Sequence, residues 1–156
     1  MKMKTIYGVI LYITLMSPLA FGQNSHDETY FPVAVWLQSA EHANEYKQDG
    51  GINMYVGLWN QLDEKQFDLL KSADMKLICH QNDFGFAHKT DPMIFGWMNG
   101  DEPDNAQWNS QTKTYDPCIS PELIVAQYDK IKEKDPDHLY YLNLGQGVSY
   151  INWVGR

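Results

Sequence analysis

The stretch FPVAVWLQSAEHANEYKQDGGINMYVGL, residues 31–58, decides the fold. It opens with a short apolar run at 31–37 that lacks strict polar alternation, as a strand covered on both faces does. A helix is predicted over 39–48, because small and aromatic residues recur three apart and the glycines at 50–51 end it. A second apolar run follows at 52–58. A strand, a helix and a strand in this order predict a parallel βαβ unit.

The same alternation continues through the rest of the chain. Asp63, with Gln66 three positions later, resembles the capping box that begins a helix. The segment 80–92 carries no convincing helix, and 100–118 reads as a long polar loop. Further strands are predicted at 76–79, 93–98 and 139–144, and a further helix begins at Ser120 as N-cap with Pro121 in its first turn and ends before Asp135-Pro136.

Two architectures contain strands and helices in this order, an open doubly wound sheet and a barrel. The open sheet usually carries a Gly-rich turn after its first strand, and Gln38-Ser39-Ala40 is not such a turn. A complete barrel needs about 250 residues and eight strands. We therefore predict an α/β fold that is a partial TIM (β/α)8 barrel, with about five parallel strands and crossover helices.

Residues 1–22 have the pattern of a secretory signal peptide. Lysines precede an apolar run of about a dozen residues, and small residues follow at 17–22, where a signal peptidase would cut. Cleavage leaves 134 of the 156 residues, which form one domain. We expect a secreted or periplasmic protein whose residues 23–156 are the N-terminal part of a barrel catalytic domain, with the remainder of the barrel truncated.

Charge and composition exclude some classes of partner. Lys2 and Lys4 leave with the signal peptide and no acid does, so the formal charge moves from −8 to −10. A nucleic-acid partner is not expected. No later apolar run approaches the roughly 20 residues of a membrane-spanning helix. Cys79 and Cys118 are the only cysteines, and they either close a disulfide in an oxidising compartment or lie apart as two thiols.

Polar and aromatic residues follow each predicted strand. In a barrel the working groups lie on the loops where strands end, so these side chains open onto one mouth. Amides, a histidine and tryptophans together suit a sugar, which offers hydroxyls at its rim and C–H faces that stack on indole. The predicted carbohydrate-binding residues are Trp59 and Trp97 as stacking walls, Asn60, His80, Asn82 and Asn99 for hydroxyls, and Trp36 at the end of the first strand.

The most specific group of candidate catalytic residues lies in the segment GWMNGDEPD at 96–104. Glycoside hydrolysis needs a carboxylic acid that protonates the departing oxygen, and an apolar wall and a second acid keep such a carboxyl protonated near neutral pH. Glu102 is the candidate acid. Asp101 either raises the pKa of Glu102 by like-charge repulsion or holds a substrate hydroxyl. Pro103 is expected to keep Glu102 extended.

The Asp-Glu-Pro turn after the fourth strand resembles the clan A glycoside hydrolases, a (β/α)8 group that includes β-galactosidases, cellulases and β-mannanases. In that group the acid/base is a Glu that ends strand four, commonly preceded by Asn and often followed by Pro. The resemblance implies this role for Glu102, with Asp101 in place of the Asn. It also implies a nucleophilic Glu at the end of a seventh strand, beyond the five strands predicted here, so the chain alone is expected to be inactive.

Two other functions remain open. A non-catalytic protein would bind glycans through the same aromatic mouth. A metal-dependent hydrolase would draw on scattered ligands, although no His-x-His or His-Glu-x-x-His motif is present. We expect no metal or cofactor, and the sequence does not define the oligomeric state. The ligands that a metal site would use are His80, Asp83, His88, Asp101 and Asp104.

Overall fold

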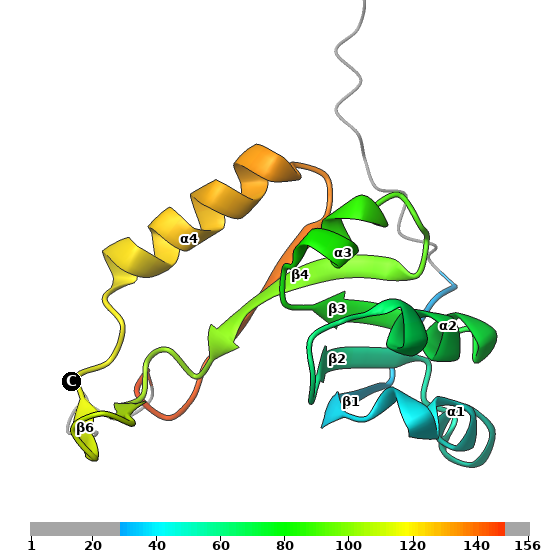
Figure 1. Ribbon diagram of the computed structural model, residues 1–156, viewed down its shortest axis with the longest axis horizontal. Coiled ribbons are helices and arrows are strands. Elements are labelled where there is room, and N and C mark those ends of the chain that lie inside the picture. Colours follow the sequence, from blue (N-terminus) through cyan, green and yellow to red (C-terminus); the bar gives the residue numbers. More distant parts are fainter. Residues whose placement is uncertain (1–28, 149–156) are drawn as a thin grey trace, which may run out of the picture.

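The computed structural model describes residues 29–148, and the predicted signal peptide lies outside the described residues. Five strands form one parallel sheet in the order β1-β2-β3-β4-β7 (Figure 1). Each strand pairs in parallel with its neighbour, so all five carboxyl ends lie at one edge of the sheet. The five predicted strands are confirmed as β1 (Ala34–Gln38), β2 (Met54–Leu58), β3 (Lys76–Cys79), β4 (Ile94–Asp101) and β7 (Leu139–Asn143).

Three predicted capping residues each lie at the end of a helix in the structure. Asp63 accepts a hydrogen bond from the backbone of Gln66 at 2.9 Å, and Ser120 caps the last helix. Gly51 ends the first helix with φ of 64°, a left-handed conformation that glycine adopts without steric cost. The elements are the 3-10 helix η1 (Ala40–His42), α1 (Ala43–Gly50), α2 (Glu64–Ser72), α3 (Asp83–Ala87) and α4 (Pro121–Lys134).

The helices cover one face of the sheet. Ala43 of α1, Phe67 of α2 and Ile131 of α4 all belong to or pack against one core cluster, which includes Tyr55 and Leu77 of the strands. Strand order follows chain order without a reversal, whereas a doubly wound sheet reverses its order and carries helices on both faces. The described chain is therefore an α/β unit with a five-stranded parallel sheet, whose edges are β1 and β7.

The opposite face of the sheet carries a second apolar cluster. Met54, Val56, Ile78 and Met98 are its buried members. Aromatic side chains pack around them at partial exposure, and Trp36 lies 6.2 Å from Tyr141 between ring centroids. Partly buried aromatics at the margin of this cluster are Tyr30, Trp36, Phe95 and Tyr141.

A β-bulge in β4 decides the direction of Trp97. Leu77 pairs with Ile94 but Ile78 pairs with Gly96, so β4 contains one extra residue, Phe95. Because side chains alternate along a strand, one extra residue reverses the face of everything that follows. Trp97 consequently enters the helix-side core and is 0% exposed. The prediction that Trp97 forms a stacking wall is therefore wrong.

Three segments differ from the sequence predictions. The short helix α3 forms where no helix was expected, and Asn82 caps it by accepting from Gly85 N at 2.7 Å. The predicted loop at 100–118 contains an antiparallel hairpin of β5 (Gln107–Asn109) and β6 (Thr114–Asp116). β4 also runs on to Asp101, beyond the predicted end at Met98, because it continues to pair with β7.

The two cysteines are separate thiols. Cys79 ends β3 within the helix-side core, and burial raises its pKa to about 12. Cys118 is partly exposed in the segment that leads into α4. The disulfide is not formed, because one thiol is enclosed by the core and the other lies in a surface connection. No helix within residues 29–148 is both long and apolar enough to cross a membrane.

Candidate functional site

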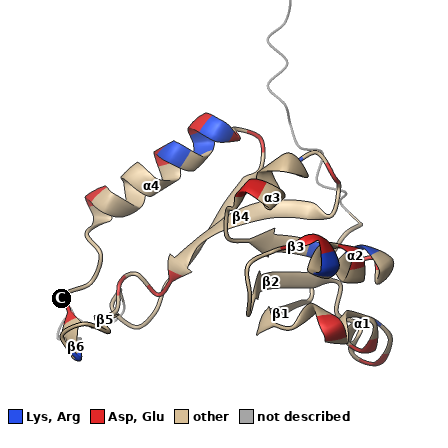
Figure 2. Cartoon of the chain, in the orientation of Figure 1, with Lys and Arg blue, Asp and Glu red and all other residues tan. Residues whose placement is uncertain are grey.

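Polar side chains gather at the carboxyl edge of the sheet, as expected for parallel strands. Gln38 ends β1, and Trp59 and Asn60 follow β2. His80 follows β3, and Asp101 ends β4. The ribbon is acidic at this end of β4 (Figure 2). The edge therefore holds carboxylates, amides, an imidazole and an indole.

Asp101 is held by the neighbouring strand. It pairs in register with Asn143, whose carboxamide donates to Asp101 Oδ1 at 2.5 Å. Desolvation lowers the pKa of His80, and the charge of nearby Asp101 opposes that effect. The side chains of Asp101, Asn143 and His80 thus form one polar cluster at the ends of three adjacent strands.

Glu102 has an unusual backbone. Its φ is 43°, in the left-handed region that non-glycine residues rarely occupy. Its N–H donates to Asn143 O at 3.1 Å, and its carbonyl accepts from Asn105 N at 3.0 Å. Glu102 is therefore not extended, contrary to the effect expected of Pro103, because the strand pairing and the turn hydrogen bond both constrain it. Backbone strain of this kind costs about 1–3 kcal/mol and recurs at functional sites.

The Glu102 carboxylate is exposed to solvent and has one amide partner. Glu102 Oε2 accepts a hydrogen bond from Asn105 Nδ2 at 2.6 Å. Asn105 was not predicted from the sequence. An amide three positions after Glu102, in a turn that contains Pro103, is nevertheless a signal for a local hydrogen bond. An accessible carboxyl with a fixed orientation can exchange a proton with a bound ligand.

A second loop anchors the turn that carries Glu102. Asp104 accepts from Gly145 N at 2.6 Å and from Val148 N at 2.9 Å. Desolvation alone would raise the pKa of Asp104, but these backbone N–H groups outweigh it and lower the pKa. Asn105 Oδ1 also accepts from Gly147 N at 3.1 Å. The loop at 145–148 therefore fixes the turn from outside β4.

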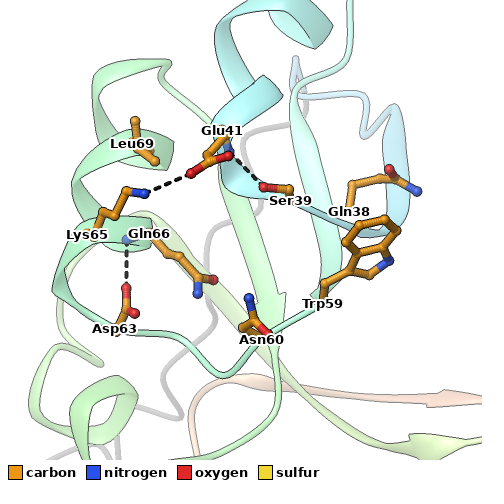
Figure 3. Close-up of a pocket in the computed structure, with 9 residues that line it drawn as sticks. All are labelled: Gln38, Ser39, Glu41, Trp59, Asn60, Asp63, Lys65, Gln66 and Leu69. Carbon is orange, nitrogen blue, oxygen red and sulfur yellow. Dashed lines mark hydrogen bonds and ion pairs between the residues drawn. The ribbon is translucent and has the colours of Figure 1, made fainter.

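Trp59 and Asn60 line a different feature, an open pocket of about 160 Å³ between η1 and α2 (Figure 3). Trp59 is 73% exposed. Between β4 and residue 148, no described residue lines this pocket. The predicted single mouth is thus divided between a pocket at β1 and β2 and a carboxylate group at β4. The pocket is lined by Gln38, Ser39, Glu41, Trp59, Asn60, Asp63, Lys65, Gln66 and Leu69.

Three other predicted binding residues have structural contacts. Asn82 caps α3 and also donates to Leu62 O at 2.7 Å, so both ends of its carboxamide are engaged. Trp36 packs against Tyr141 beside the second apolar cluster. Asn99 Oδ1 accepts from Gly100 N at 2.7 Å, while its Nδ2 is buried with no hydrogen-bond partner among the described residues. Asn99 therefore keeps a buried amide nitrogen that is free to bind a ligand.

The candidate metal ligands do not form a cluster. Within the described part of the chain, no three His, Cys, Asp or Glu side chains lie close enough together to hold a metal ion. His88 stacks on Phe84 with ring centroids 4.2 Å apart, and its Nδ1 lies 2.8 Å from Phe84 O. Asp104 is occupied by backbone N–H groups. The described geometry therefore offers no ligand set for the metal-dependent alternative.

Comparison of the chain with known protein families, with curated proteins and with solved structures finds no significant match. The residues at the carboxyl edge of the sheet are therefore the basis for a functional proposal.

Proposed function

We propose that this chain is a secreted, glycoside hydrolase-like protein in which Glu102 supplies the acid/base carboxyl. The observation that carries the proposal is the placement of Glu102. It follows the fourth parallel strand, its φ is 43°, and its exposed carboxylate accepts from Asn105 at 2.6 Å. Left-handed backbone at a non-glycine residue recurs at functional sites, and here it coincides with an exposed carboxylate of fixed orientation, which supports a functional role.

The chemistry assigned to Glu102 is proton transfer. When the bond between the anomeric carbon and the glycosidic oxygen breaks, the Glu102 carboxyl donates its proton to that oxygen, and the alcohol departs. The resulting carboxylate then removes a proton from a water molecule, whose oxygen bonds to the anomeric carbon, and the sugar is released as the free hemiacetal. Asn105 orients the carboxyl, because its Nδ2 holds Oε2 and leaves the other oxygen available.

Asp101 and its neighbours suit substrate positioning. Its carboxylate is held by Asn143 at 2.5 Å, and this contact orients it without burying it. An oriented carboxylate can accept hydrogen bonds from sugar hydroxyls, as one of the two roles expected for Asp101 requires. His80 at the end of β3 is the next polar group along this edge.

We further propose that the sheet is part of a (β/α)8 barrel. Two features support this architecture: strand order equals chain order, and the helices pack on one face while the other face carries its own apolar cluster. In a barrel the second face becomes the packed interior. The resemblance to clan A hydrolases then calls for a second catalytic Glu at the end of a seventh strand, outside residues 29–148.

A non-catalytic glycan-binding protein is the second candidate. The observation that favours it is the separation of the Trp59 pocket from Glu102, since none of the described residues from β4 onward lines that pocket. Binding at Trp59 therefore does not require the carboxylate. The two candidates make different predictions for substitution of Glu102.

The test is hydrolysis by the complete product of the gene, secreted and purified in its mature form. It is incubated with a panel of aryl glycosides and plant and microbial polysaccharides, and released sugar is measured. We expect Glu102→Gln to lower kcat by about 10²–10⁴, the usual contribution of a general acid. Glu133→Gln, which alters an exposed carboxylate on α4, is the matched control and retains full activity.

Two results would overturn the proposal of catalysis. One is a wild-type protein that binds glycans from the panel but cleaves none of them, which favours the binding protein. The other is a Glu102→Gln variant that cleaves polysaccharides at the wild-type rate, because the poor leaving group of a polysaccharide needs the proton of a general acid.

A further inference from the structure

The pocket beside Trp59 has the chemistry of a separate ligand site. Trp59 and Gln38 lie next to each other at one end of it, and side chains of α2 lie along the other side (Figure 3). The pocket opens between the first two helical connections and shares no lining residue with the Glu102 turn. Its function can therefore be considered independently of catalysis.

The pocket holds polar groups that the fold does not use. Gln38 is engaged, because it donates to Trp36 O and accepts from Tyr46. Asn60 differs, since its carboxamide has no hydrogen bond to any described residue. Among the described contacts the Trp59 indole N–H has none either, and the side chain is 73% exposed. A large exposed indole with an unengaged amide beside it offers both an apolar surface and hydrogen bonds to a ligand.

Of the described residues that line the pocket, the one cationic side chain is paired within the protein. Lys65 Nζ lies 2.8 Å from Glu41 Oε1, so its positive charge already has a partner. Asp63 accepts from Gln66 N as the N-cap of α2. With its cation paired, the pocket has no group that would favour a phosphate or a carboxylate. An uncharged ligand with hydroxyl groups is the best chemical match.

The size of the pocket limits the ligand to about one ring. Its volume of about 160 Å³ is below the roughly 300–1,000 Å³ of sites for drug-sized molecules. A single pyranose has an apolar C–H face for the indole and hydroxyls for the amides.

We propose that the Trp59 pocket binds one neutral sugar ring of a carbohydrate chain, as an accessory site separate from Glu102. The ring stacks on Trp59, and its hydroxyls bond to Asn60 and to Gln66 Oε1, whose own Nε2 is bound to Gln61 O. This inference goes beyond the proposed hydrolysis, because it needs no bond breaking at Glu102.

The experiment measures binding of methyl pyranosides of glucose, galactose, mannose and xylose, and of short oligosaccharides of each, by ligand-observed NMR. We expect at least one of these probes to bind weakly. Trp59→Ala should weaken that binding about tenfold or more, because the indole supplies most of the apolar contact. Trp59→Phe should retain part of it, and Asn60→Ala should weaken it less than Trp59→Ala does.

Two control variants separate this site from the rest of the molecule. Trp108→Ala removes another exposed tryptophan, 56% exposed on the β5–β6 hairpin, and should leave binding unchanged. Glu102→Gln should also leave binding at this pocket unchanged, even if it abolishes hydrolysis. If no probe binds, or if Trp59→Ala binds as the wild type does, the accessory site is refuted, whatever the hydrolysis assay gives.

Discussion

Replacement of Asp135 by Ala is the perturbation whose effect the structure defines most fully. Asp135 is 2% exposed and follows α4 directly. Its Oδ2 accepts from Trp97 Nε1 at 2.9 Å, and His138 Nδ1 lies 2.8 Å from the same oxygen. The contact joins the end of α4 to the core of β4, across 38 positions of sequence.

The expected loss follows from the groups that the substitution leaves behind. Trp97 is 0% exposed, so its indole N–H would be buried without an acceptor. An unsatisfied buried donor costs about 1–3 kcal/mol, and a hydrogen bond to a charged group contributes about 1.5–3 kcal/mol. The two costs are not fully additive, because both include the loss of the same hydrogen bond. We therefore expect Asp135→Ala to lower the free energy of unfolding by about 3 kcal/mol. Asp129→Ala, at an exposed position on α4, should change it by less than about 0.5 kcal/mol.

Urea unfolding followed by far-UV circular dichroism measures both variants, and a double-mutant cycle isolates the contact. In a Trp97→Phe background the donor is absent, so Asp135→Ala should cost about 1–2 kcal/mol less than it does in the wild type. Equal losses in the two backgrounds would refute the reasoning, because they would show that the contact between Trp97 and Asp135 contributes nothing.

The pH dependence of this contribution has a defined sign. Desolvation would raise the pKa of Asp135, but the hydrogen bond from Trp97 and the His138 imidazole beside the carboxylate outweigh it, so the folded-state pKa lies below its ordinary value. The stabilisation is therefore complete above the unfolded carboxyl pKa of about 3.9 and is lost as the pH falls through the folded pKa. The difference in the free energy of unfolding between wild type and Asp135→Asn should shrink as the pH falls through the folded-state pKa of Asp135.

Two further predictions concern the cysteines and the loop that anchors Glu102. Iodoacetamide at pH 8 should alkylate Cys118 but not Cys79, whose pKa is raised to about 12 by burial. Denaturation should allow a second adduct, on Cys79. Failure to form any adduct without a reductant would instead indicate a disulfide. Gly147→Ala should displace the Glu102 turn and lower both stability and hydrolysis, because its Cβ would lie 2.0 Å from Asp104 O. Gly100→Ala is the control, since a Cβ there meets nothing within 4 Å. Equal behaviour of the two variants in thermal melting and sugar-release assays would contradict this prediction.

Local signals in the sequence were sufficient for most of the secondary structure. The cap residues Asp63 and Ser120 define their helices by hydrogen bonds to residues three positions away, so each can be read from a short segment. The strand at 76–79 is also reproduced by the structure with the predicted bounds. The short helix α3 was missed because its five residues show too little periodicity, although Asn82 was a recognisable cap.

Long-range contacts explain what the sequence did not predict. The direction of Trp97 depends on the bulge at Phe95, which arises from the pairing of β4 with β3. The contact of Asp101 with Asn143 spans 42 positions, and that of Asp104 with Gly145 spans 41. No local pattern encodes such pairs. The division of the expected mouth into a Trp59 pocket and a Glu102 turn likewise depends on where the loops pack.

The leaving-group dependence of hydrolysis tests the central claim about Glu102 most directly. The complete gene product and its Glu102→Gln variant are compared on a series of aryl glycosides, from 2,4-dinitrophenyl to unsubstituted phenyl. A departing dinitrophenolate needs no proton, so we predict that the variant retains almost the wild-type kcat/KM for the dinitrophenyl glycoside, while the loss in kcat/KM grows to about 10²–10⁴ for phenyl. A loss of equal size for every leaving group would contradict the assignment of Glu102 as the general acid.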